Sequence, residues 1–162
     1  MKTILITGAT SGIGLAAAKK LANEKNQLIL CGRRQPKLDE ISEELSKSAN
    51  VLSLCFDVSN KNKVSKLLSN LPKKFSSVNI LINNAGNAHG LDTIQDGSLD
   101  DWDNMIDSNV KGLLYVSRVI MPKMIEQQSG HIINIGSLAG REVYEKGNIY
   151  CATKHAVNAI SK

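Results

Sequence analysis

Tyr150 and Lys154 stand four residues apart in the stretch "NIYCATKHAV". Four residues are about one helical turn, so a phenol and an ammonium at this spacing would share one helix face and could act on the same atom. A phenol has an ordinary pKa of about 10, and an ammonium in a partly desolvated site lowers it toward neutrality. The pair could therefore exchange a proton with an oxygen atom. Because such pairs are also common on solvated helix surfaces, this one needs support from the elements that position it.

Short apolar segments alternate with amphipathic segments along the whole chain. The apolar segments predict buried strands, and the amphipathic segments predict helices. Their connections are too short for anything but parallel pairing through helical crossovers. The predicted fold class is therefore α/β: one Rossmann-type domain over residues 1–162 with a doubly wound parallel sheet of order 3-2-1-4-5. The expected strands are Lys2–Thr7, Gln27–Cys31, Val51–Asp57, Val78–Asn84 and His131–Ser137, and the expected helices are Gly14–Lys25, Gln35–Lys47, Lys61–Leu71, Ser98–Gln127 and one that opens near Tyr150.

Composition excludes several classes of protein. The 162 residues are 42% hydrophobic and 22% charged, which is ordinary for a soluble globular protein. The net charge of +5 comes from scattered lysines with no basic run between aromatics, so we expect no nucleic-acid partner. No apolar run approaches the roughly 18 residues that span a bilayer, so we expect no membrane association. The three cysteines are far apart and predict reduced thiols in a cytoplasmic protein, and the three histidines lack ligand spacing, so we expect no metal.

A glycine-rich loop, "TGATSGIG", directly follows the first expected strand. Gly8 would permit the sharp turn off the strand, and Gly12 would let the backbone approach a pyrophosphate without a Cβ in the way. Gly14 would let the helix pack close to the sheet. The spacing differs from the standard G-x-G-x-x-G fingerprint, and glycine turns are common, so the triplet gains its weight from its position. We expect a nucleotide site at the carboxyl edge between the first and fourth strands.

The second expected strand ends in "LILCGRRQ", which bears on the choice of nucleotide. A fold that selects NAD usually places an acid there, about 20 residues past the glycines, to accept from the ribose 2′-hydroxyl. Arg33 and Arg34 occupy that region instead. A guanidinium offers a 2′-phosphate a bidentate, charge-assisted contact, so the sequence predicts NADP. The alternative is two solvated arginines at a strand end.

Five motifs occur in the order and spacing of one known family: "TGATSGIG", "NNAG" at Asn83–Gly86, Asn109, Ser137 and "YCATK". Along all 162 residues the chain resembles the classical short-chain dehydrogenases/reductases. The stretches "GRRQPKL", "HIINIGSLAG" and "GNIYCATK" are similar to the NADP-dependent 3-hydroxy acid (serine) dehydrogenases within that family.

The resemblance implies a role for each motif residue. Tyr150 would be the acid/base, and Lys154 would lower the pKa of its phenol and bind the nicotinamide ribose. Ser137 would hydrogen-bond the substrate oxygen, and the backbone carbonyl of Asn109 would hold a relay water, although Ser137 could be an ordinary turn residue and Asn109 an ordinary helical break. Asp57 would contact the adenine, beside Val58. The implied cofactor-binding residues are Gly8, Thr10, Ser11, Gly12, Ile13, Gly14, Arg33, Arg34, Asp57, Val58, Asn84, Ala85, Gly86, Tyr150 and Lys154.

The expected function is an NADP-dependent oxidoreductase that transfers a hydride between the nicotinamide and a small hydroxy acid or alcohol, or its ketone. A 3-oxoacyl reductase and a nucleotide-binding module without turnover remain alternatives; the catalytic set favours an enzyme, and the chain end at Lys162 favours a module. Family members continue with two more strands and associate as homodimers or homotetramers. The resemblance therefore implies a longer parent chain, and we expect little activity from residues 1–162 alone.

Overall fold

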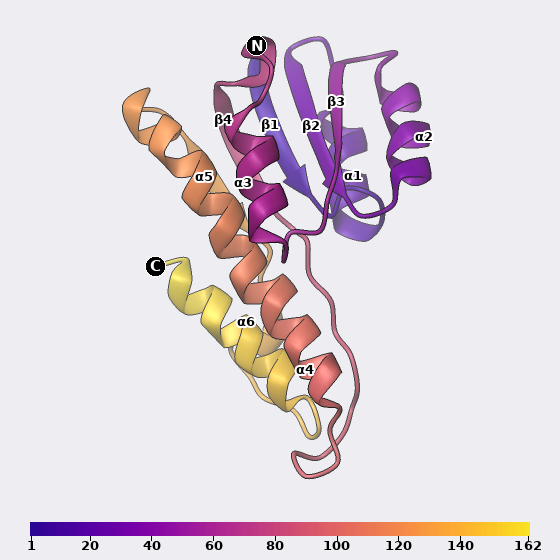
Figure 1. The fold of residues 1–162 in the computed structure, drawn as a ribbon, viewed down its shortest axis with the longest axis vertical. Helices are drawn as coiled ribbons and strands as arrows, with labels where there is room; N and C mark the ends of the chain where they lie inside the picture. The colour runs from indigo at the N-terminus through magenta and orange to yellow at the C-terminus, as the bar shows by residue number, and fades with distance from the viewer.

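The strands of the chain form one parallel sheet with helices on both faces (Figure 1). The computed structural model describes residues 1–162. The strands lie in the order β3-β2-β1-β4-β5, which confirms the predicted topology. They are β1 (Lys2–Thr7), β2 (Asn26–Gly32), β3 (Asn50–Cys55), β4 (Val78–Asn83) and β5 (His131–Asn134); the helices are α1 (Gly12–Leu21), α2 (Gln35–Leu45), α3 (Lys61–Ser69), α4 (Leu99–Ile106), α5 (Leu113–Glu126) and α6 (Asn148–Ile160).

Two apolar cores lie on opposite faces of the sheet, because successive strand side chains point to opposite sides. Leu5 on β1 belongs to the core under α3 and α5, whereas its neighbours Ile4 and Ile6 belong to the core under α1 and α2. All three side chains are essentially inaccessible to solvent. Burial on both faces explains why these strands are continuous apolar runs rather than alternating ones.

The order of the strands reverses at β1, which pairs with β2 on one side and β4 on the other. The loops that leave the carboxyl ends of β1 and β4 must therefore diverge, and a crevice opens between them. None of the helices is long and apolar enough to cross a membrane.

The predicted helix over Ser98–Gln127 is interrupted by one π-helical segment, Asp107–Gly112, between α4 and α5. The three pieces form one rod, and α6 lies beside its lower part in Figure 1. The buried side chain of Asn109, within the π segment, hydrogen-bonds outside the rod. π turns inside α-helices are frequent at functional sites of proteins, which makes this segment a candidate.

Several boundaries differ from the predicted ones, and the two largest differences are at the ends of α1 and β5. The first helix ends at Leu21 rather than Lys25, because the side-chain amides of Asn23 and Asn26 both donate to the carbonyl oxygen of Leu21. The last strand ends at Asn134 rather than Ser137, although the amide of Ile135 still donates to Asn83 O at 2.9 Å.

Candidate active site

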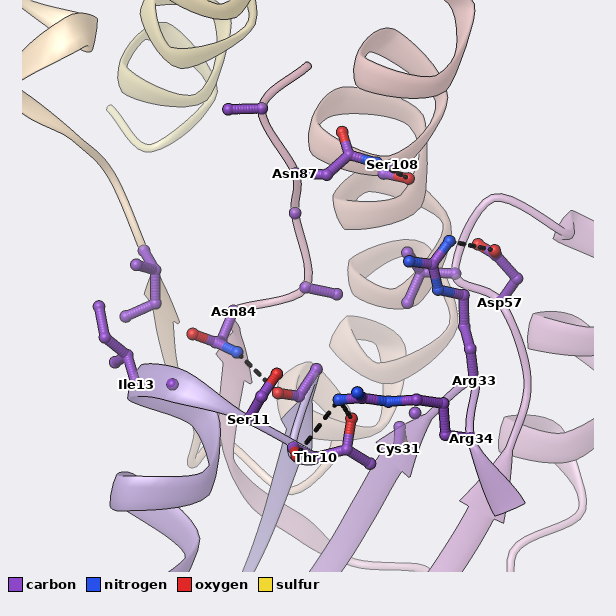
Figure 2. Close-up of a pocket in the computed structure, with 18 of the residues that line it drawn as sticks. Thr10, Ser11, Ile13, Cys31, Arg33, Arg34, Asp57, Asn84, Asn87 and Ser108 are labelled. Atoms are coloured by element: carbon purple, nitrogen blue, oxygen red, sulfur yellow. Dashed lines mark hydrogen bonds and ion pairs between the residues drawn. The ribbon is translucent and has the colours of Figure 1, made fainter. Parts of the chain in front are cut away.

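A cavity of about 770 Å³ opens at the carboxyl edge of the sheet (Figure 2). Residues that follow all five strands line it, together with two side chains of α6. The structure thus brings segments that are far apart in sequence to one site. The predicted residues that line the cavity are Gly8, Thr10, Ser11, Gly12, Ile13, Arg33, Arg34, Asp57, Val58, Asn84, Ala85, Gly86, Tyr150 and Lys154.

Three predicted residues do not line the cavity. A Cβ on Gly14 would collide with the side-chain amide of Asn84 and the carbonyl of Gly8, so Gly14 serves close packing of α1. Ser137 is exposed, and its hydroxyl accepts from the amide of Ala139 at 3.1 Å. Asn109 is 2% exposed and lies behind the cavity.

Sequence reasoning missed other lining residues. Most of them lie at or just past the carboxyl end of a strand, where the sheet topology places a crevice. Their position relative to the predicted strands could therefore have identified them. Ser108, in the π segment, carried no such signal. These residues are Cys31, Gly32, Phe56, Asn87, Ala88, Ser108, Ile135 and Gly136.

The glycine loop presents open backbone to the cavity. Gly8 and Gly12 have φ angles of +65° and +53°, the left-handed region that side chains disfavour. A Cβ added at Gly12 would meet nothing within 4 Å. No side chain caps the first turn of α1, and no acid lies in it. The amides and the positive end of this helix are therefore available to an anion.

The loop after β4 is bonded to the turn after β1. The Asn84 side-chain amide donates to Thr7 O at 3.0 Å and to Gly8 O at 3.1 Å. In return, the Thr7 hydroxyl oxygen accepts from the backbone amides of Asn84 and Ala85, each at 3.0 Å. These four bonds fix one wall of the cavity against the glycine loop.

The two arginines have different partners in the cavity. Arg34 Nη2 donates to the hydroxyl and the carbonyl of Thr10, at 2.9 and 3.3 Å, and so supports the glycine loop (Figure 2). Arg33 Nη1 makes one contact, with Asp57 Oδ2 at 3.3 Å, and its side chain is 66% exposed. Its remaining N–H groups are free to bind an anion.

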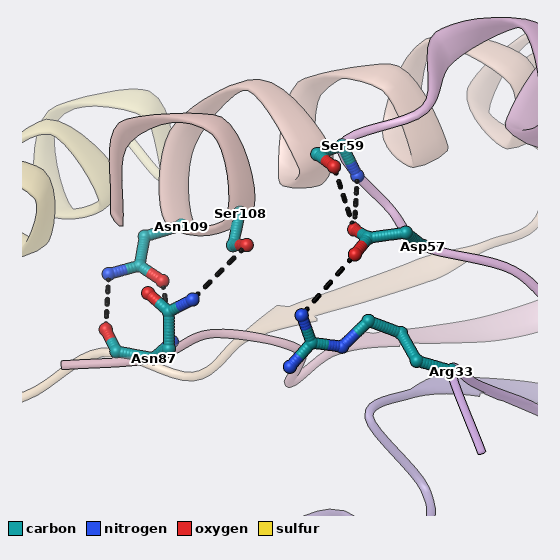
Figure 3. Close-up of polar contacts among 6 residues, drawn as sticks. All are labelled: Arg33, Asp57, Ser59, Asn87, Ser108 and Asn109. Atoms are coloured by element: carbon teal, nitrogen blue, oxygen red, sulfur yellow. Dashed lines mark hydrogen bonds and ion pairs between the residues drawn. The ribbon is translucent and has the colours of Figure 1, made fainter. Parts of the chain in front are cut away.

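Asp57 is held as a carboxylate at the edge of the cavity. Its Oδ1 accepts from the amide and the hydroxyl of Ser59, at 2.9 and 2.8 Å, opposite the contact of Oδ2 with Arg33 (Figure 3). Partial burial raises the pKa of Asp57. The bonds from Ser59 and the Arg33 guanidinium together lower it by more, so the pKa lies below its ordinary value.

Tyr150 and Lys154 lie one turn apart on α6 and face the same cavity. Lys154 Nζ is 5.9 Å from the centre of the Tyr150 ring and donates to the carbonyl of Ile135 at 2.9 Å. Burial lowers the pKa of the Lys154 ammonium. One of its three donors is used by Ile135, which leaves two for other oxygen atoms in the cavity.

Asn109 joins three segments behind the cavity. Its Oδ1 accepts from the amide of Asn87 at 2.8 Å, and its Nδ2 donates to the carbonyl of Asn87 at 2.8 Å (Figure 3). Nδ2 also donates to the hydroxyl of Thr153 at 3.1 Å. The side chain is therefore fully engaged, and it links the loop after β4 to α6.

The family model described as short chain dehydrogenase matches residues 2–162. The chain belongs to the short-chain dehydrogenase family. Among curated relatives of this short-chain dehydrogenase, an NADP-dependent 3-hydroxy acid dehydrogenase from Shigella flexneri is 42% identical over 158 residues. An NADP-dependent 3-hydroxy acid dehydrogenase from Schizosaccharomyces pombe is 43% identical over 159 residues. These matches cover 98% and 96% of the present chain, but only 63% and 61% of the relatives.

Solved short-chain dehydrogenases have the same fold. Serine dehydrogenase from Escherichia coli is 41% identical and superposes with a TM-score of 0.91, covering 98% of this chain and 73% of that one. A closed form of serine dehydrogenase in complex with NADP⁺ has a TM-score of 0.92 and the same identity, and the match covers 98% of this chain and 63% of that one. Fold and family are therefore as the sequence predicted.

Proposed function

We propose that the protein is an NADP-dependent dehydrogenase that transfers a hydride between the nicotinamide and a small hydroxy acid or alcohol, or the corresponding ketone. The observation that carries this proposal is that Tyr150 and Lys154 line the same cavity as the glycine loop and Arg33. Groups that could transfer a proton thus lie in one cavity with a loop that could bind a phosphate. The printed activities of the relatives from Shigella and Schizosaccharomyces support the same reaction class.

The lining residues fit NADP. The uncapped start of α1 and the open backbone at Gly12 suit a pyrophosphate. Arg33 retains free donors for a 2′-phosphate, and the ionised Asp57 beside it can accept from an adenine or ribose donor. Bound NADP would supply the hydride donor or acceptor.

The residues of the chain would then handle the proton. In the reducing direction the Tyr150 hydroxyl would protonate the oxygen that becomes an alcohol, and in the oxidising direction the phenolate would take that proton back. The two free donors of Lys154 would stabilise the phenolate and bind ribose hydroxyls. Ser137 accepts from Ala139, so its own proton remains free to bond the substrate oxygen. For Asn109 we propose that its backbone carbonyl holds a relay water behind Lys154.

Cofactor titration and turnover test this proposal together. We expect NADPH to bind at least about tenfold more tightly than NADH, because a charge-assisted contact contributes roughly 1.5–3 kcal/mol. With NADP⁺ and a panel of 3-hydroxy acids, including serine, we expect NADPH to accumulate when the chain is extended to the length of its relatives, as followed by its absorbance. Equal affinities for the two cofactors would refute the NADP assignment. Tight binding with no turnover of any substrate would favour a nucleotide-binding module, and preferred reduction of 3-oxoacyl compounds would favour an oxoacyl reductase.

We also propose a cytoplasmic location and a homodimeric or homotetrameric assembly. The free thiols of Cys31, Cys55 and Cys151 support a reducing compartment. Light scattering of the purified protein tests the assembly, and a monomeric mass would rule it out. Fractionation of the source cells tests the location.

A further inference from the structure

Thr153 is a buried hydroxyl between the two residues of the proposed catalytic pair. It is 2% exposed, lies on α6, and directly precedes Lys154. Its Oγ1 donates to the backbone carbonyl of Tyr150 at 2.8 Å and accepts from Asn109 Nδ2 at 3.1 Å. A hydroxyl has one proton to donate, so these two bonds fix its orientation.

The bonds of Thr153 continue into the cavity wall. Asn109 exchanges two bonds of 2.8 Å with the backbone of Asn87, and Asn87 lines the cavity (Figure 3). An unbroken path of hydrogen bonds therefore runs from the loop after β4, through Asn109 and Thr153, to the backbone of Tyr150. Asn109 and Thr153 are both fully buried, so water does not compete for the bonds between them.

A second contact holds the same helical turn. Lys154 Nζ donates to the carbonyl of Ile135, just past β5, at 2.9 Å. The turn that carries both reactive groups is thus fixed from two directions: from the β5 side through Lys154, and from the β4 side through Thr153. The turn also packs against Leu138–Gly140, so we expect loss of either contact to displace it slightly rather than release it.

We propose that Thr153 is a positioning residue for the reaction of Tyr150 and Lys154. Its hydroxyl sets the position of their helical turn relative to the Asn87 wall of the cavity and takes no part in proton transfer itself. The proposal rests on the proposed function, because the hydrogen bonds of Thr153 would matter for turnover only if Tyr150 and Lys154 take part in the reaction. Misplacement of reactive groups by about 1 Å can reduce turnover on the order of 100-fold.

Two substitutions at Thr153 separate positioning from simple packing. Thr153→Val keeps the shape but removes the hydroxyl, and Thr153→Ser keeps the hydroxyl. In a chain extended to the length of its relatives, we expect Thr153→Val to lower kcat about 10- to 100-fold with KM and NADPH affinity unchanged, and Thr153→Ser to keep kcat close to wild type. If Thr153→Val had the same kcat as wild type, whether or not its KM changed, the proposal would be overturned.

Thr3 supplies a matched control outside the site. It is 3% exposed, and its hydroxyl accepts from Gln27 Nε2 at 3.3 Å, just as Thr153 accepts from an amide nitrogen. Each amide keeps a second acceptor, Lys74 O for Gln27 and Asn87 O for Asn109. Thr3→Val should therefore lose an accepted bond like the one from Asn109 to Thr153, without the donated bond that Thr153 also makes, and leave kcat unchanged. If Thr3→Val lost as much kcat as Thr153→Val, the loss at Thr153 would be explained by lower stability of the fold, and the proposal would be overturned.

Hydrogen exchange tests the coupling without turnover. In Thr153→Val we expect faster exchange at the amide of Asn87, which donates to Asn109, and at amides in the first turns of α6. Thr153→Ser and Thr3→Val should exchange there like wild type. Unchanged exchange in Thr153→Val would reject the positioning role even if wild type is active. If the wild-type chain, extended to the length of its relatives, is inactive but its exchange follows this pattern, the proposed function is rejected and the coupling stays in place.

Discussion

The side-chain amide of Asn84 donates a hydrogen bond of 3.1 Å to the carbonyl oxygen of Gly8. This bond crosses the point where the strand order reverses, and a second bond from the same amide to Thr7 O reinforces it. The glycine loop is therefore not shaped by its glycines alone. It depends on a residue more than seventy positions later in the chain.

The first prediction concerns Asn84→Asp. The substitution removes both donors and places a carboxylate against two carbonyl oxygens, next to the proposed pyrophosphate. We expect the free energy of unfolding to fall by about 1–3 kcal/mol and the Kd for NADPH to rise about tenfold or more. Urea denaturation and fluorescence titration measure the two effects. Asn84→Ala, which removes the bonds without adding charge, should weaken NADPH binding less, and the reverse order would contradict the charge argument.

The second prediction concerns Gly14→Ala. The new Cβ would collide with backbone at Gly8 and with the side chain of Asn84, so we expect a loss of about 1–3 kcal/mol in the free energy of unfolding. Gly136→Ala is the control, because its Cβ would meet nothing within 4 Å and its φ is not positive. The control should stay within about 0.5 kcal/mol of wild type. Equal stabilities for the two variants in urea would show that the packing at Gly14 is adjustable.

The third prediction separates the two arginines. Arg33→Ala removes the exposed guanidinium and should weaken NADPH binding about tenfold or more while leaving NADH affinity nearly unchanged. Arg34→Ala removes the support of Thr10 and should weaken the binding of both cofactors, because both use the glycine loop. Fluorescence titration of each variant with both cofactors gives the four constants. If Arg34→Ala alone lost NADPH binding while keeping NADH binding, Arg34 rather than Arg33 would be the residue that binds the 2′-phosphate.

The fourth prediction is that Tyr150→Phe removes turnover and spares binding. As the proposed acid/base, the phenol would act mainly in the transition state, so in a chain extended to the length of its relatives kcat should fall about 100-fold or more while the Kd for NADPH stays the same. Steady-state kinetics and cofactor titration on the same preparation measure both. Retention of more than about 5% of kcat would mean that another group transfers the proton.

The fifth prediction is a pH dependence of stability that originates at Asp57. The folded-state pKa of Asp57 is lowered, so its contribution is complete above the ordinary pKa of an Asp and is lost as the pH falls through the folded value. We expect wild type to be more stable than Asp57→Asn at about pH 6, and the difference to shrink toward about pH 3. Denaturant titrations across this range measure it. A difference that stays constant with pH would show that the carboxylate charge contributes nothing.

Much of the fold could be predicted because the signals are local. The apolar runs of the strands, the glycine loop and the position of Arg33 are all visible in the chain itself. The boundary at Leu21 was missed because two asparagine side chains, rather than helix propensity, end that helix. Propensity is a weak guide wherever a side chain competes for a backbone carbonyl.

The frame behind the site could not be predicted. The partners of Asn109 lie 22 and 44 residues away, at Asn87 and Thr153, and nothing near Asn109 in the sequence indicates a π turn. Ser108 was missed as a cavity residue for the same reason. Its place depends on how the rod and the loop after β4 pack together, which is a property of the assembled fold.

The π segment at Asp107–Gly112 also has a geometric consequence for the whole rod. Each residue of an α-helix advances the rotation by about 100°, and a π turn holds one residue more than an α turn, so α4 and α5 are out of phase by about that angle. With this offset, α4 packs against α6, whereas α5 packs against β4 and α3. A one-residue deletion here would change no side chain of α4, yet it would swing buried Met105 away from its contacts. A change of length at this point would therefore rotate a helix face rather than adjust a loop.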